Sequence, residues 1–303
     1  MPAPVDLLVI LGPTASGKTR LAVAAARRVG GEIVSADSRQ VFRGMDLGTG
    51  KDLAEYGEVP HHLIDILEPG EEFSLFAFQQ RCYAAIAGIR GRGRLPILCG
   101  GTGLYLDAVL RRYRLVEVPE NPPLRAELAL LDDDALRERL RALRPEQHNS
   151  TDLLDRSRLV RAIEIAEGEP DAPEPPPPPE LHPLVFGLRW ERAELRRRIA
   201  ARLEERLAQG MVQEVRRLHE ERGISWERLD YYGLEYRYLA RHLRGELSEE
   251  ELVRQLAAAI GDFAKRQETF FRRMERQGVA IRWLDGAGEP LAEMMRIIAS
   301  WEE

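Results

Sequence analysis

The sequence contains few cysteines and no long apolar run. Only two cysteines, Cys82 and Cys99, occur among 303 residues, and neither has the spacing of a metal-binding motif. This argues against a disulfide scaffold and a zinc module. The longest early apolar run, residues 5–11, is interrupted by Asp6 and follows no basic segment, so we expect neither a membrane span nor a signal peptide. A cytoplasmic protein is the expectation.

Lysine is also rare. Only three of the 44 basic residues are lysines, and the other 41 are arginines, for which codon bias in a GC-rich genome is the simplest explanation. The net charge of −6 gives no reason to favour a nucleic-acid partner, although a local basic surface is compatible with it. The length and the 44% hydrophobic content indicate one large folded domain or two of ordinary size.

The first part of the chain alternates segments typical of strands and helices. Strands are expected at residues 5–11, 32–35, 63–67 and 95–99, and helices at 19–29, 74–89 and 103–110. This rhythm predicts a parallel sheet covered by helices on both faces. We assign residues 1–116 to the first part of this α/β core.

Residues 117–182 interrupt the pattern. We expect only helices there, at 122–131, 133–143 and 151–167, followed by an extended proline-rich linker at 169–183. Residues 183–303 then complete the core. They are expected to contain strands at 182–190 and 279–284 and helices at 192–209, 212–222, 234–244, 249–276 and 291–301.

The segment after the first expected strand matches the pattern G-x-x-x-x-G-K-[ST]. It consists of Gly12, Pro13, Thr14, Ala15, Ser16, Gly17, Lys18 and Thr19. Between a strand and a helix, such a loop wraps a phosphate with backbone N–H groups and the positive end of the helix dipole. Lys18 adds a positive charge, and the Thr19 hydroxyl is suited to bind Mg²⁺. The loop predicts a phosphorylated ligand without identifying it.

Asp37 follows the second expected strand. Ligands collect at the carboxyl ends of strands in open parallel sheets, so we expect Asp37 near whatever the loop holds. Three roles are open for it: a carboxylate that binds a metal ion, a general base, or the N-cap of a following helix.

These motifs and several later ones resemble the tRNA dimethylallyltransferases, also called tRNA isopentenyltransferases. The resemblance rests on GPTASGKT, SADSRQVFRGMDLGTGKD, PHHLIDI and LPILCGGTGLYLDAVL, in this order, and then on RSRLVRAIEI and FAKRQETFFRR. It extends from about Leu7 to Trp283. It implies a core like that of the P-loop-containing nucleoside triphosphate hydrolases, with an inserted helical domain. Members of the family transfer a prenyl group from dimethylallyl diphosphate to N6 of an adenosine beside the anticodon.

The resemblance also implies roles for the matching residues. Lys18, Thr19 and the loop amides would hold the diphosphate with Mg²⁺, and Asp37 would be the general base. Ser38 and Gln40 would contact the flipped adenosine, and Arg202 would lie where donor and acceptor meet. Further contacts with the tRNA anticodon arm are expected from Arg39, Thr102, Ser157, Arg158, Arg161, Lys265 and Arg266. We expect a monomer without an obligate protein partner, whose loop also has the features of an ATP-binding site.

Four segments depart from the family's pattern. Ser157 stands in place of the glutamine of Q-R-x-x-R, and Phe270 in place of a tryptophan. GTGKD at 48–52 replaces GTAKP, and DYYGLEY at 230–236 replaces G-Y-K/R-[EQ]. We interpret them as marks of a divergent branch, which affect the expected tRNA contacts more than the reaction.

The expected helix at 249–276 combines two faces. An apolar face is predicted from Leu256, Ile260, Phe263, Phe270 and Met274, and a basic stripe from Lys265, Thr269, Arg272 and Arg276. The stripe is suited to follow an RNA backbone, and the alternative is an ordinary solvated surface. Intrahelical ion pairs are expected for much of the arginine cluster formed by Arg196, Arg197, Arg198 and Arg202, and core positions for Tyr231, Tyr232 and Tyr236.

Two other functions compete with prenyl transfer. A small-molecule or nucleotide kinase shares the loop and the parallel core, and it would bind a nucleotide rather than an allylic diphosphate. A non-catalytic RNA-binding protein would keep the loop for folding, and its activity would not change in an Asp37→Asn variant.

Overall fold

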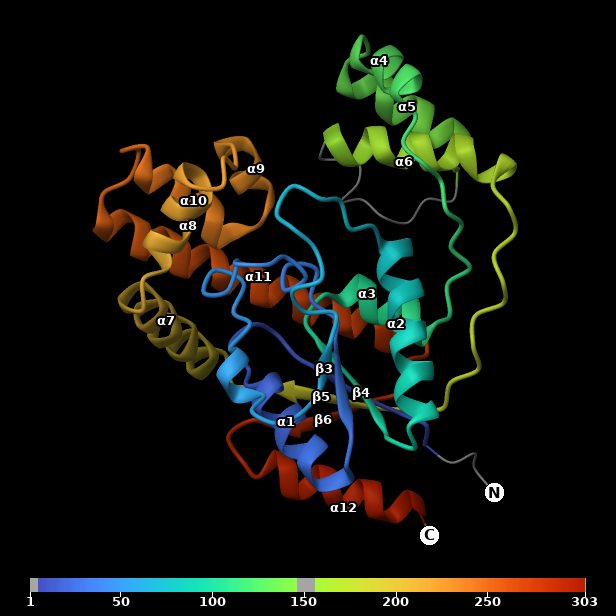
Figure 1. Cartoon of the computed structure of the whole chain (residues 1–303), viewed down its shortest axis with the longest axis vertical. Helices are drawn as coiled ribbons and strands as arrows, with labels where there is room; N and C mark the ends of the chain where they lie inside the picture. The colour runs from blue at the N-terminus through green and yellow to red at the C-terminus, as the bar shows by residue number, and fades with distance from the viewer. Residues whose placement is uncertain (1–4, 146–155, 303) are drawn as a thin grey trace. The chain divides into compact units, whose positions relative to one another are not determined.

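The computed structural model describes residues 5–145 and 156–302, which belong to two compact units (Figure 1). One unit combines the chain up to Arg112 with the chain from Pro179, and the other runs from Tyr113 to Pro178. No helix among the described residues combines the length and the apolar character needed to cross a bilayer.

A six-stranded parallel sheet lies at the centre of the first unit. Its strands are β1 (Leu7–Leu11), β2 (Glu32–Ser35), β3 (His61–His62), β4 (Pro96–Gly100), β5 (Pro183–Arg189) and β6 (Ile281–Asp285). Their order across the sheet is β3-β2-β4-β1-β5-β6, and Val9 of β1 lies opposite Leu98 on one side and Val185 on the other. Every residue of β1 and β4 is buried, as continuous apolar strands in a covered parallel sheet require. The expected fold class is confirmed.

Helices cover both faces of this sheet. Those of the first unit are α1 (Lys18–Val29), α2 (Leu75–Gly91), α3 (Gly103–Leu110), α7 (Arg192–Ala208), α8 (Met211–Glu220), α9 (Trp226–Tyr231), α10 (Leu234–Leu243), α11 (Glu249–Arg276) and α12 (Pro290–Glu302). Because successive strand residues point to opposite faces, Leu8 and Ile10 pack with α1 and α12, whereas Leu7 and Val9 pack with α2, α3 and the end of α11.

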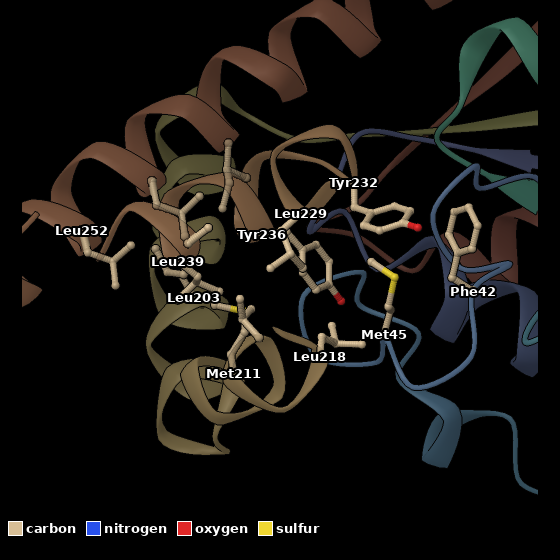
Figure 2. Packing of buried hydrophobic residues seen from close by; sticks show 14 of the residues in the cluster. Phe42, Met45, Leu203, Met211, Leu218, Leu229, Tyr232, Tyr236, Leu239 and Leu252 are labelled. Atoms are coloured by element: carbon tan, nitrogen blue, oxygen red, sulfur yellow. The ribbon is translucent and has the colours of Figure 1, made fainter. Parts of the chain in front are cut away.

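A separate hydrophobic cluster joins α7, α8, α9, α10 and the first half of α11 (Figure 2). Tyr232 and Tyr236 lie in it, each 1% exposed, as expected. The same expectation is wrong for Tyr231, which is 49% exposed. The apolar face expected on α11 is wrong at Phe263, which is 40% exposed, because the buried stripe of this helix passes through Ala264 and Gln267 instead.

The secondary structure differs from the expectation at β3 and at α9. The strand expected at 63–67 is the two-residue β3, because Leu63 and Asp65 both have positive φ and turn the chain out of the sheet. Leu67 keeps only an isolated bridge to Phe42. The short helix α9 was not expected, and it is capped by Ser225, whose hydroxyl accepts a hydrogen bond from the N–H of Arg228.

The second unit is helical. It contains α4 (Pro122–Ala129), α5 (Asp133–Leu143), α6 (Arg156–Gly168) and a 3₁₀ turn at Glu169–Asp171. Asp132 caps α5, and its carboxylate accepts a hydrogen bond from the N–H of Ala135. Residues 151–155, where the third helix was expected to begin, lie outside the described residues. The extended linker expected at 169–183 is shorter in the structure, because Glu169–Asp171 forms the 3₁₀ turn and β5 begins at Pro183. Residues 172–182 form neither helix nor strand, as their proline content predicts.

Candidate active site

The phosphate loop connects β1 to α1. Gly17 begins the helix with φ of 88°, a conformation that a residue with a side chain adopts only with strain. A Cβ on Gly12 would lie 2.7 Å from the hydroxyl oxygen of Ser16. Ser16 itself is 2% exposed, and its hydroxyl has no hydrogen-bond partner among the described residues. A buried hydroxyl of this kind, beside the first N–H groups of a helix, fits an oxyanion ligand.

Three side chains from distant segments hold the loop from outside. Gln267 of α11 accepts a hydrogen bond from the N–H of Thr14 at 2.8 Å and donates one to the carbonyl of Gly101 at 2.9 Å. The Trp190 indole donates to the carbonyl of Ser16, and the Arg198 guanidinium to that of Ala15, both at 2.9 Å. These contacts could not be found from the sequence, because no motif spacing connects residues so far apart.

Asp37 lies in a turn that is tied to the GGTG loop after β4. Its Oδ1 accepts the N–H of Arg39 at 2.9 Å, and no helix begins there, so the N-cap role is wrong. The Thr102 hydroxyl accepts the N–H of Ser38 at 3.1 Å, and the N–H of Thr102 donates to the carbonyl of Ala36 at 3.2 Å. Thr14, Gln267, Gly101, Thr102 and Ser38 thus form a chain of contacts from the phosphate loop to the Asp37 turn.

The charges of Asp37, Asp52 and Arg202 act on the Lys18 ammonium. Burial lowers the pKa of the Lys18 ammonium, and the positive charge of Arg202 acts in the same direction. The negative charges of Asp37 and Asp52 oppose this effect and favour the protonated lysine. Two acidic residues and two basic residues therefore influence one another at the carboxyl end of the sheet.

A pocket opens next to the loop. It is lined by Thr14, Ala15, Ile199, Arg202, Leu203, Arg206, Met211, Glu235 and Ile260. Burial raises the pKa of the Glu235 carboxyl. With aliphatic side chains, two guanidinium groups and the phosphate loop on its walls, this pocket is chemically suited to a short hydrocarbon chain joined to a diphosphate.

The arginines of α7 only partly follow the expectation of intrahelical pairing. Arg197 pairs with Glu194 on the same helix. Arg198 and Arg202 do not, because one reaches the phosphate loop and the other the carboxylate of Asp52. For these two residues the expectation is wrong.

The other predicted contact residues fall into three places. Gln40 is 8% exposed, and its amide accepts from the Ser35 hydroxyl at 2.9 Å and donates to the Gly50 carbonyl at 3.1 Å. Lys265 and Arg266 are exposed on α11. Ser157, Arg158 and Arg161 belong to α6 of the second unit. There Arg161 bonds to the Glu164 carboxylate and, at 2.7 Å, to the Val118 carbonyl.

The residues present fit a magnesium ion that takes part of its ligands from a bound substrate. Within 5–145 and 156–302 no group of three or more His, Cys, Asp and Glu side chains is arranged to hold a metal. Thr19 is half-buried in the first turn of α1. Mg²⁺ commonly takes few protein ligands and completes its shell with water and phosphate oxygens, so one hydroxyl beside a phosphate loop fits it.

Comparison with known proteins identifies the family. The family model described as IPP transferase matches residues 40–274, and the one described as isopentenyl transferase matches residues 5–58. The chain belongs to the IPP transferase family. The family resemblance inferred from the motifs is thereby confirmed.

Relatives of the IPP transferase family match nearly the whole chain. A tRNA dimethylallyltransferase 2 from Pelobacter propionicus is 66% identical, over 97% of this chain and 94% of its own length. One from Syntrophotalea carbinolica is also 66% identical, over 97% and 99%. The crystal structure of a tRNA isopentenylpyrophosphate transferase from Bacillus halodurans has a TM-score of 0.71 and 34% identity, over 98% of this chain and 96% of that one.

Proposed function

We propose that the protein transfers the dimethylallyl group of dimethylallyl diphosphate to N6 of the adenosine on the 3′ side of the anticodon. The substrates are tRNAs that read codons beginning with U, and the second product is diphosphate. Family membership supports the reaction. The observation that carries the proposal is the chain of hydrogen bonds that holds the phosphate loop and the Asp37 turn together.

The phosphate loop binds the leaving group. As the bond between the allylic carbon and the diphosphate oxygen breaks, negative charge grows on the diphosphate. Preorganised N–H donors of the loop and the Lys18 ammonium stabilise this charge without having to reorient. The N–H of Thr14 is committed to Gln267, so the donors come from residues farther along the loop and from the first turn of α1. A P-loop can serve prenyl transfer in this way without hydrolysing ATP.

Thr19 is the residue that would hold Mg²⁺, together with oxygens of the diphosphate. When bound, the ion supplies Lewis-acid stabilisation of the charge on the leaving group.

Asp37 receives the proton of the attacking amine. The exocyclic amine is a poor nucleophile, and as its nitrogen forms the new bond to carbon, one N–H proton must leave. The N–H of Arg39 orients Oδ1 of Asp37, which leaves Oδ2 to accept that proton. The adenine must first leave its stack, because a stacked base cannot reach such a site. We place this reaction in the cytoplasm.

An Asp37→Asn variant tests the proposal. We expect tRNA binding to persist and transfer from labelled dimethylallyl diphosphate to unmodified tRNA to fall by about 10²–10⁴-fold, the usual contribution of a general base. An Asp262→Asn variant on the exposed surface of α11 makes the same charge change away from the site and should transfer normally. ATP turnover without prenyl transfer by the native protein would instead indicate a kinase.

A further inference from the structure

Two arginines of α7 converge on one carboxylate beside the phosphate loop. Arg202 and Arg206 are four residues apart, so their side chains leave the same face of the helix. Oδ2 of Asp52 accepts a hydrogen bond from Arg202, and Oδ1 accepts one from Arg206 at 3.1 Å. The side chains of Asp52 and Arg202 are each 29% exposed, and that of Arg206 is 11% exposed. The result is a largely buried bridge with one negative charge between two positive charges.

The backbone of residues 50–52 is shaped to admit this bridge. Gly50 has φ of 66°, and a Cβ there would lie 2.2 Å from Nη2 of Arg206. Asp52 has φ of 47°, a left-handed conformation that Asp adopts more readily than most residues. Asp52 precedes the 3₁₀ turn Leu53–Glu55, but its side chain does not cap that turn. Its carboxylate is therefore used for the two arginines rather than for its own backbone.

The carboxylate offsets an unfavourable arrangement of charge. Burial lowers the pKa of the Arg202 guanidinium, the nearby Arg206 lowers it further, and Asp52 opposes both effects. Without Asp52, two guanidinium groups on one helix face would repel each other next to a third cation, Lys18. Each arginine uses only Nη2 in the bridge, although a guanidinium carries five N–H donors.

We propose that Asp52 is a positioning residue that holds Arg202 and Arg206 at the phosphate loop, with their remaining donors directed to the leaving diphosphate. Both arginines line the pocket that includes Thr14 and Ala15 of the loop. Donors that are oriented before the reaction stabilise developing charge without reorganisation, which is the advantage the bridge provides. The inference rests on the proposed function in one respect, namely that the donor substrate is a diphosphate.

Inorganic pyrophosphate with Mg²⁺ tests this role without any transfer reaction. Asp52→Asn keeps the shape of the side chain but removes its charge. We expect its affinity for pyrophosphate, measured by isothermal titration calorimetry, to fall by about 10-fold, which is the scale of one lost charge-assisted hydrogen bond. The KM for dimethylallyl diphosphate should rise by a similar factor, while the KM for tRNA stays constant. Asp52→Glu should recover part of the loss, because it restores a carboxylate that can reach both arginines.

Two further variants separate positioning from a general effect of charge. Glu55 lies three residues away, is exposed, and influences the same arginine without bonding to it. Glu55→Gln should therefore leave pyrophosphate affinity unchanged. Gly50→Ala should weaken it as Asp52→Asn does, because the added methyl group would displace Arg206.

Unchanged or tighter pyrophosphate binding in folded Asp52→Asn protein would overturn the inference, since the carboxylate would then be irrelevant to the arginines or would compete with the diphosphate for them. Equal loss in Glu55→Gln would also overturn it. Failure of prenyl transfer in the native protein would count against the proposed function, whereas pyrophosphate binding decides the role of Asp52 independently.

Discussion

Gln267 satisfies two backbone groups on two different loops with one buried side chain. Its carbonyl oxygen accepts from Thr14, 253 residues earlier, and its amide donates to Gly101. A Cβ on Gly101 would lie 2.5 Å from that amide, so the close approach also requires glycine at this position. The spacing between the phosphate loop and the GGTG loop therefore depends on a residue of α11.

Replacing Gln267 with leucine should damage both stability and donor binding. The change leaves the N–H of Thr14 and the carbonyl of Gly101 without partners, which costs about 1–3 kcal/mol in the free energy of unfolding. We expect kcat/KM for the prenyl donor to fall by about 10-fold or more, because small displacements of an oriented loop are expensive in rate. Denaturant unfolding and steady-state kinetics measure the two effects. Gln209→Leu, an exposed position at the end of α7, is the matched control, and unaltered kinetics in Gln267→Leu would contradict this role.

Some site residues could be predicted from local sequence motifs, and others could not, because their roles depend on long-range contacts. Lys18 and Thr19 could be assigned because their whole context, strand, loop and helix, lies within about 25 residues of sequence. Asp37 could be placed near them from the geometry of parallel sheets. Trp190 and Arg198 could not be found in this way, because their contacts with the loop depend on how β5 and α7 pack against it.

At the scale of elements, α8 anchors a loop that has no regular structure. The Glu214 carboxylate accepts the N–H groups of Asp46, Leu47 and Gly48 at 2.7–3.0 Å, and the Tyr236 hydroxyl donates to it at 2.7 Å. Glu214 is 4% exposed. The loop that leads to Lys51 and Asp52 is therefore held by one buried side chain.

Glu214→Ala should destabilise the protein by about 2–4 kcal/mol, because it leaves three backbone N–H groups without their acceptor. The free energy of unfolding in urea measures this loss. Tyr236→Phe removes only one of the four hydrogen bonds and should cost about 1 kcal/mol. A loss in Glu214→Ala no larger than that of Tyr236→Phe would show that the backbone contacts contribute little.

Elements with a local signal were predicted well, and those decided by tertiary contacts were not. The helices expected at 74–89 and 133–143 begin close to those positions, with Ser74 and Asp132 as their N-caps, since capping depends on a few adjacent residues. The end of β3 depends instead on positive φ at Leu63 and Asp65, where the buried Lys51 ammonium binds Asp65. No pattern in the segment itself reveals that partner.

At the scale of the whole molecule, the sheet and its connections are held partly by a buried charge. Glu32 begins β2 and is 3% exposed. Its carboxylate accepts hydrogen bonds from Arg92, at the end of α2, at 2.7 and 3.1 Å, and lies 2.7 Å from Nε2 of His62 in β3. Three elements therefore depend on the ionised form of one side chain, which makes stability dependent on pH.

The hydrogen bonds from Arg92 outweigh burial and, with His62, lower the pKa of Glu32 from 4.5 to about 2. Because the folded pKa is depressed, the stabilisation is fully present above pH 4.5 and is lost as pH falls toward 2. We expect Glu32→Gln to lower the free energy of unfolding by up to about 3 kcal/mol at pH 7 and by much less near pH 2. Urea unfolding across this range measures the difference.

Glu58→Gln, which breaks the exposed pair with Arg27, should change stability little at any pH. If Glu32→Gln lowers the free energy of unfolding by the same amount from pH 7 to pH 2, side-chain packing, and not ionisation, accounts for the effect of Glu32.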